Sequence, residues 1–139
     1  MKRLAITALL VASAACAQAQ EDPPLDCSNQ ITQSDMNQCS YLDYERADKE
    51  LNAVYRQAVR SQEEMDKQAA EMNPAYVGAL KALKKAQRAW IDYRDGHCDG
   101  VGYAGVGGSI QPLLINGCLA RLTENRTKEL RELIEGLGN

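Results

Sequence analysis

The sequence has little of what metal and nucleophilic chemistry needs. Its 139 residues include one histidine, His97, and a zinc site would need further ligands. His97 adjoins Cys98, but neighbouring residues on a helix point about 100° apart, so a Cys–His nucleophile pair is geometrically poor. The acidic residues are scattered along the helices that we predict below, and no convincing pair of catalytic carboxylates stands out. We therefore expect no metal, no cofactor and no enzymatic activity.

The sequence also lacks strand patterns and internal repeats, and it has no long apolar run after its N-terminal segment. No run of alternating apolar and polar residues is long enough to predict a strand. The balance of 19 acidic to 16 basic residues argues against nucleic-acid binding, which needs clustered Lys and Arg. Residues 100–105 match GxGxxG literally, but they follow a predicted helix rather than a strand, and this excludes the dinucleotide-binding reading.

The N-terminus has the form of an export signal. Two basic residues precede an apolar run at 4–16, and residues 17–19 form a small-x-small cleavage site. This run is shorter than the about 20 residues that span a bilayer. We predict a signal peptide at 1–19 and a periplasmic mature chain with no membrane span. Alternatively, Cys16 is acylated as in a lipoprotein, although Ser13 stands where Leu is usual.

Four cysteines remain after cleavage, and an even number in an oxidising compartment predicts two disulfides. Cys39 would lie about 10 Å along a helix that begins at Thr32, within reach of extended chain from Cys27. We favour Cys27–Cys39 together with Cys98–Cys118, which closes a glycine-rich loop. The alternative joins Cys39 to Cys98, because antiparallel helices bring those two ends together.

An extended lead-in is expected over residues 20–31, and the first helix begins at Thr32. Thr32 and Asp35 form a variant capping box. One helical face then recurs at steps of three and four residues; it comprises Met36, Cys39, Ala47, Leu51, Val54 and Ala58. Residues 61–71 are polar, and the pattern leaves them either helical or frayed.

Asn73 followed by Pro74 predicts the start of the second helix. Its expected inner stripe is Tyr76, Leu80, Leu83, Gln87, Trp90, Arg94 and His97. We expect a loop from Gly96, because six of the ten glycines fall between 96 and 108. Ser109 is expected to cap the third helix and Gly136 to end it. The third stripe is Ile115, Leu119, Leu122, Arg126, Leu130, Leu133 and Leu137.

These patterns predict a small all-α domain at 32–137, a three-helix antiparallel bundle held by two disulfides. Three polar residues, Gln87, Arg94 and Arg126, occupy stripe positions where leucine would pack best. A half-buried guanidinium needs a partner, because an unpaired buried charge is very costly. The candidate partners are Asp43, Asp48, Glu50, Asp95 and Glu129. We interpret these residues as an internal network that sets helix register, with a recognition surface as the alternative.

The glycine-rich loop is tipped by Tyr103, and loops on a rigid scaffold often carry binding. Position alone makes Tyr103 and Ser109 the first candidate contact residues, followed by Arg94 and Asp95. A plain connector is the competing interpretation of the loop. Trp90 is most simply a packing residue of the core stripe.

Several segments together resemble a known family. Residues 32–39 with 47–55 look like its first helix, and residues 87–95 with Cys98 resemble its second signature. Residues 107–109, Cys118 and 122–130 look like its third. This pattern is similar to the LprI-type lysozyme inhibitor domain of bacterial envelopes, formerly a domain of unknown function (DUF1311). All four family cysteines have counterparts here, and the resemblance spans about residues 27 to 134.

The resemblance implies an exported, non-enzymatic helical protein, with lysozyme inhibition proposed for the family's named member. It assigns no inhibitory residues. We therefore expect a periplasmic protein that binds and inhibits a lysozyme-type glycoside hydrolase. The alternative is an envelope interaction module that binds another periplasmic protein or peptidoglycan without inhibiting lysozyme.

Overall fold

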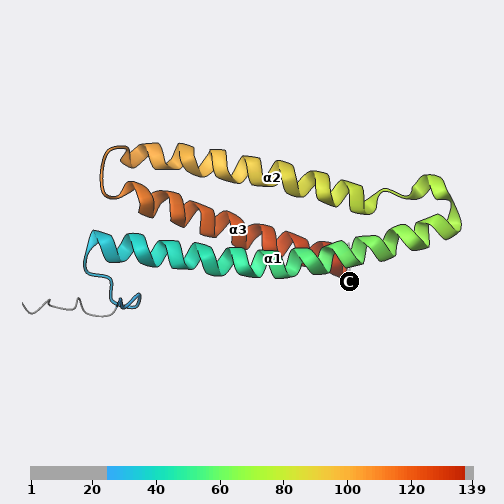
Figure 1. The fold of residues 1–139 in the computed structure, drawn as a ribbon, viewed down its shortest axis with the longest axis horizontal. Coiled ribbons are helices and arrows are strands. Elements are labelled where there is room, and N and C mark those ends of the chain that lie inside the picture. The colour runs from blue at the N-terminus through green and yellow to red at the C-terminus, as the bar shows by residue number, and fades with distance from the viewer. Residues whose placement is uncertain (1–24, 137–139) are drawn as a thin grey trace, which may run out of the picture.

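The structure, a computed structural model, describes residues 25–136. The predicted signal peptide, Cys16, the first part of the lead-in and Leu137 lie outside the described residues. Within them the chain forms three long helices, α1 (Gln33–Met72), α2 (Ala79–Gly102) and α3 (Gln111–Glu135), with two short 3₁₀ turns, η1 (Pro74–Tyr76) and η2 (Tyr103–Gly105). The helices run antiparallel in chain order, and α1 extends past the end of α3 (Figure 1). The predicted three-helix bundle is confirmed.

The start of α1 is the one that local hydrogen bonding predicts. The Thr32 hydroxyl accepts from the Asp35 backbone N–H at 3.1 Å, and the Asp35 carboxylate accepts from the Thr32 N–H at 3.0 Å. These bonds hold the pKa of Asp35 below its ordinary value. The helix then continues without a break through residues 61–71, the segment that the pattern left open. Ahead of α1, residues 26–29 form a turn in which the Asn29 N–H donates to the Asp26 carbonyl.

The connection between α1 and α2 differs from the predicted helix start. The Asn73 side chain does cap a helix by accepting from the Ala75 N–H at 2.9 Å, but that helix is the single turn η1. α2 begins later, at Ala79. Its first amides donate to the carboxylate of Asp66, which lies twelve or more residues back on α1. The start of α2 therefore depends on a tertiary contact.

The predicted loop from Gly96 is wrong, because α2 continues through Gly96 and Gly100 to Gly102. Packing overrides the poor helix propensity of glycine here. Cys98 is fully buried. A Cβ on Gly102 would lie 2.5 Å from Ile115 Cγ1, so the close approach of α3 requires a glycine at that position.

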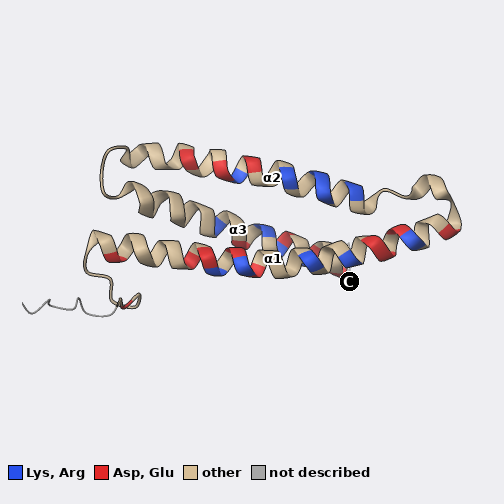
Figure 2. Ribbon diagram, in the orientation of Figure 1, with Lys and Arg blue, Asp and Glu red and all other residues tan. Residues whose placement is uncertain are grey.

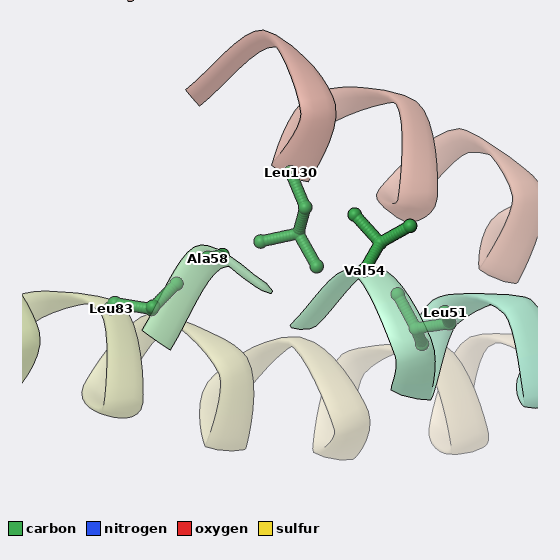
Figure 3. Packing of buried hydrophobic residues seen from close by; sticks show 5 residues of the cluster. All are labelled: Leu51, Val54, Ala58, Leu83 and Leu130. Atoms are coloured by element: carbon green, nitrogen blue, oxygen red, sulfur yellow. The ribbon is translucent and has the colours of Figure 1, made fainter. Parts of the chain in front are cut away.

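The core confirms the predicted face of α1 and corrects that of α3. Leu51, Val54 and Ala58 pack with Leu83 and Leu130 in one buried cluster (Figure 3). On α3, however, Leu133 is 40% exposed, while two threonines at 123 and 127 are almost completely buried. The residues of α3 that are buried from solvent are Cys118, Ala120, Thr123, Thr127 and Leu130. Apart from Leu130 these side chains are small, which suits the close packing of α3 on α1, the most extensive helix contact of the bundle.

The prediction of the inner stripe of α2 is confirmed at the centre of the helix and wrong at both ends of the stripe. Leu83, Gln87 and Arg94 are buried, and Trp90 packs against the core cluster. Tyr76, at 67% exposed, and His97 instead face solvent. Near the end of α2 the buried positions are Cys98 and Gly102.

Candidate functional site

Two disulfides gather the helix ends at one end of the bundle. Cys27 bonds to Cys39 and Cys98 bonds to Cys118, each with 5.5 Å between the Cα atoms. The favoured pairing is therefore confirmed, and the alternative between Cys39 and Cys98 is wrong. We call this end, where α1 begins, α2 ends and α3 begins, the disulfide end. In the chain-entropy description each bond contributes about 3 kcal/mol to stability.

The loop at the disulfide end exposes apolar side chains. We call residues 103–110 the tip loop. Within it Tyr103 is 71% exposed, and Val106 and Ile110 are also exposed. The loop is nevertheless compact: a Cβ on Gly105 would lie 2.8 Å from Ile110 Cγ2, and Gly107 has a φ of +77°. A folded loop that exposes apolar side chains suits contact with another molecule.

Ser109 anchors the tip loop rather than capping α3. Its carbonyl accepts from the Asn37 side-chain amide at 2.9 Å, which ties the loop to α1. The N-cap of α3 is instead Ile110, without a side-chain hydrogen bond, so the predicted cap at Ser109 is wrong. Asn116 of α3 also donates weakly to the Ser40 hydroxyl of α1, at 3.4 Å. The tip loop is therefore held between a disulfide and polar contacts with α1.

Arg94 of α2 is buried, with 8% of its area exposed. Its Nε donates to Asp95 Oδ1 at 2.8 Å, and its Nη1 donates more weakly to Asp48 Oδ1 at 3.5 Å. The guanidinium carbon lies 5.1 Å from the Trp90 ring centroid and 5.5 Å from that of Tyr44. Burial raises the pKa of Tyr44. Arg94 thus joins α1 to α2 internally and holds Asp95, whose side chain remains 54% exposed.

The other polar stripe residues also find partners inside the bundle. Arg126 Nε donates to Gln87 Oε1 at 3.1 Å, and its Nη1 donates to Glu129 at 2.7 Å. Asp48, Asp95 and Glu129, three of the candidate partners, therefore pair with the two arginines. The remaining two, Asp43 and Glu50, pair with Arg46 and Arg131.

Charge is unevenly distributed along the molecule (Figure 2). The first half of α1 is mainly acidic, and the last part of α2 adds Asp92, Asp95 and Asp99. The first part of α2 is basic and carries Lys81, Lys84, Lys85 and Arg88. The tip loop therefore lies beside a predominantly acidic surface.

His97 lies on the surface near this region and stacks on Tyr93, with ring centroids 5.4 Å apart. Its neighbour Cys98 is in a disulfide and offers no thiolate. In the part of the chain that the structure describes, no group of three or more His, Cys, Asp or Glu could hold a metal ion. No helix among residues 25–136 is long and apolar enough to cross a membrane.

Sequence reasoning missed two of the contacts that shape the site. Asn37 was unremarkable, because its partner Ser109 is 72 residues away and the bond uses a backbone carbonyl. Asp66 lay in the undecided polar segment, yet its carboxylate accepts from three backbone amides at 2.8, 2.8 and 3.1 Å. Neither residue carries a local motif that marks its role.

Comparison with known proteins places the chain in a family. The model of a family described as "Lysozyme inhibitor LprI" matches residues 26–130, which include all four paired cysteines and the tip loop. A protein of Rhizobium meliloti (strain 1021), described as uncharacterized, is 50% identical over 131 residues, covering 94% of each chain. No solved structure matches. The chain belongs to the LprI lysozyme inhibitor family.

Proposed function

We propose that this protein is exported to the periplasm and inhibits a lysozyme-type muramidase by binding it with the tip loop. The exposed apolar side chains of that loop, near helix segments rich in acidic residues (Figure 2), carry the proposal. The family description supports it by naming the same activity. Tyr103 is the central contact in this proposal, with Ser109 and Asp95 as further contacts.

Charge favours such an encounter. Lysozymes are usually basic proteins, and complementary charge raises the rate of association and orients the partners. The carboxylates near the tip loop, including Asp95 and Asp99, would steer a basic enzyme towards the disulfide end. Arg94 is buried, so its proposed part is to position Asp95 rather than to touch the enzyme.

Rigidity favours inhibition once the partners meet. A muramidase cleaves its substrate in a cleft between two carboxyl groups. The tip loop is held by the Cys98–Cys118 bond and by the Asn37–Ser109 hydrogen bond, so little ordering entropy is lost on binding. The exposed aromatic side chain of Tyr103 belongs to a residue type that is enriched among the residues that dominate binding energy in protein interfaces.

The test is a cell-wall turbidity assay with lysozyme and the native, disulfide-bonded chain. We expect inhibition that decreases after reduction of the disulfides. Tyr103→Ala should weaken inhibition about tenfold or more, by the usual cost of removing an aromatic hot spot. Tyr76→Ala is the matched control, because Tyr76 is equally exposed but lies in η1, at the opposite end of the bundle.

A binding measurement with the same enzyme separates the possible outcomes. Lysozyme that is neither bound nor slowed at large molar excess of the chain would reject the proposal for that enzyme. Binding without inhibition, or recovery of a different periplasmic protein or of peptidoglycan in a pull-down, would favour the interaction module.

A further inference from the structure

The charges of α2 stand in an order that the helix itself does not favour. Lys81, Lys85 and Arg88 lie towards its N-terminus, and Asp92 and Asp99 lie towards its C-terminus (Figure 2). The helix dipole favours acidic residues in the first turn and basic residues in the last turn, and therefore disfavours both Lys81 and Asp99. The stability of α2 alone therefore does not explain the arrangement.

These five residues are also without ion-pair partners in the described part of the chain. All five are exposed. Together with Asp95 they follow one another at steps of four and three residues, so they form a single stripe along the helix. The inner stripe of α2 faces the other helices, and this charged stripe faces solvent.

A row of mostly small residues, interrupted by Tyr93, runs beside the charged stripe and is equally exposed. Glycine weakens a helix interior, and yet two glycines stand in the row where a Cβ would meet open space. Packing within the chain does not require them, whereas the close approach of a second helix would use them. The small residues of the row are Ala82, Ala86, Ala89, Gly96 and Gly100.

The charged stripe of one α2 helix is complementary in charge to the same stripe of a second copy that runs in the opposite direction. Lys81 and Asp99 lie nine residues on either side of residue 90, and Arg88 and Asp92 lie two residues on either side of it. Lys85 and Asp95 follow the same rule at five residues, although Asp95 also accepts from Arg94. An antiparallel copy of α2, centred on residue 90, therefore places an acid opposite every base.

We propose that the exposed face of α2 is the interface of a symmetric homodimer. A two-fold axis near residue 90 pairs each basic residue of one copy with an acidic residue of the other, giving six ion pairs over about 27 Å of helix. A partner of uniform charge would satisfy only half of the stripe and would be repelled by the other half. A second copy satisfies both halves. Because the pairs are exposed, the dimer is weak and sensitive to salt.

Sedimentation velocity of the disulfide-intact chain, at low and high salt, tests this proposal. We expect a dimer at low salt that dissociates at high salt. Two variants reverse one half of the stripe each and leave Asp95 untouched: Lys81→Glu/Arg88→Glu, and Asp92→Lys/Asp99→Lys. Each variant alone should bind itself about tenfold more weakly or worse, and an equimolar mixture of the two should form a heterodimer.

The variant that carries all four changes should dimerise again, since it restores complementarity and also suits the helix dipole. The matched control is Arg56→Glu/Arg60→Glu on α1, which changes the net charge equally at exposed positions and should leave the dimer intact. A wild-type chain that is monomeric at low salt would overturn the proposal. Mixed half-reversed variants that stay monomeric would overturn it as well.

The proposal does not depend on lysozyme inhibition. The paired segment ends at Asp99, before the tip loop, so Tyr103→Ala is expected to leave the sedimentation of the chain unchanged. Asp95 and Asp99 belong to both proposals, so the half-reversed variants are read only by sedimentation and inhibition is read only in Tyr103→Ala. Loss of inhibition in that variant and loss of the dimer in the half-reversed variants are then separate failures.

Discussion

Replacing Arg94 by methionine tests whether a buried guanidinium holds α1 and α2 together. Arg94 donates to Asp95 at 2.8 Å and to Asp48 at 3.5 Å. It also lies over the rings of Trp90 and Tyr44. Methionine has a similar length and adapts to irregular packing, so Arg94→Met removes the charge and its hydrogen bonds while most of the side-chain volume remains.

The expected loss of folding free energy is about 1–2 kcal/mol. The two ring contacts contribute about 0.5–1 kcal/mol each. The bond to Asp95 adds less than a fully buried pair would, because solvent screens half-exposed carboxylates. The side chains of Asp48 and Asp95 are 38% and 54% exposed, so water rehydrates them when Arg94 is lost. The roughly 3–5 kcal/mol cost of a stranded buried charge therefore does not apply.

Urea and thermal unfolding with intact disulfides measure this effect. For a domain of this size, a loss of about 1–2 kcal/mol lowers Tm by about 5–10 °C. Arg46→Met is the control, because Arg46 pairs with Asp43 on the surface and its side chain is 69% exposed. That change should stay within about 0.5 kcal/mol of the wild type. If Arg94→Met were as stable as the wild type while lysozyme binding disappeared, the guanidinium would act in recognition and the reasoning above would be wrong.

Two further pairs of variants and one single substitution follow from the packing and the cap of α2. Leu130→Ala should lower the free energy of unfolding by about 3–4 kcal/mol, whereas Leu133→Ala, at a 40% exposed position, should cost under about 1 kcal/mol. Thr123→Val should be neutral or stabilising, because Thr123 Oγ1 is buried without a partner among the described residues. Thr127→Val should cost about 1 kcal/mol, because its hydroxyl donates to the Thr123 carbonyl at 2.9 Å. Asp66→Asn should lower Tm at neutral pH, since backbone amides of α2 lower the pKa of Asp66.

The pH dependence of the last change has a definite sign. A carboxyl group whose pKa is lower in the folded state stabilises the fold above its unfolded pKa, about 3.9, and this contribution is lost as pH falls through the lower folded value. The Tm difference between wild type and Asp66→Asn should therefore shrink below about pH 4. A difference that persists undiminished at lower pH would contradict this account. Equal losses in the leucine pair would contradict the assigned face of α3, and equal losses in the threonine pair would contradict the hydrogen bonding assigned to the two hydroxyls. Chemical denaturation with intact disulfides measures the leucine and threonine pairs.

The parts of the site that were predicted correctly rest on short-range signals. The capping box of Thr32 and Asp35 joins residues three apart, and the disulfide between Cys27 and Cys39 closes over twelve residues. The periodicity of α1 marks its buried face because one long helix passes the whole bundle. Tyr103 was chosen from its place in a glycine-rich segment; its 71% exposure agrees with a surface position, and its role in binding stays a prediction.

The parts that were missed depend on partners distant in sequence. Helix propensity predicts a break at Gly96, but a disulfide to α3 and close packing at Gly102 keep α2 helical. Most residues on the buried face of α3 are small, which lets α1 approach closely, and Leu130 is the leucine that this face accommodates. Asp66 caps α2 only after α1 has turned back on the chain.

The amino-acid sequence by itself determined the helical class of this protein and the inner face of α1, because hydrogen bonds and apolar steps within a few residues suffice for these. Tertiary structure alone decided which face of α3 is buried, where α2 begins and ends, and which of the two open cysteine pairings forms. Those outcomes depend on the distances between helices, and only the packed bundle sets these distances.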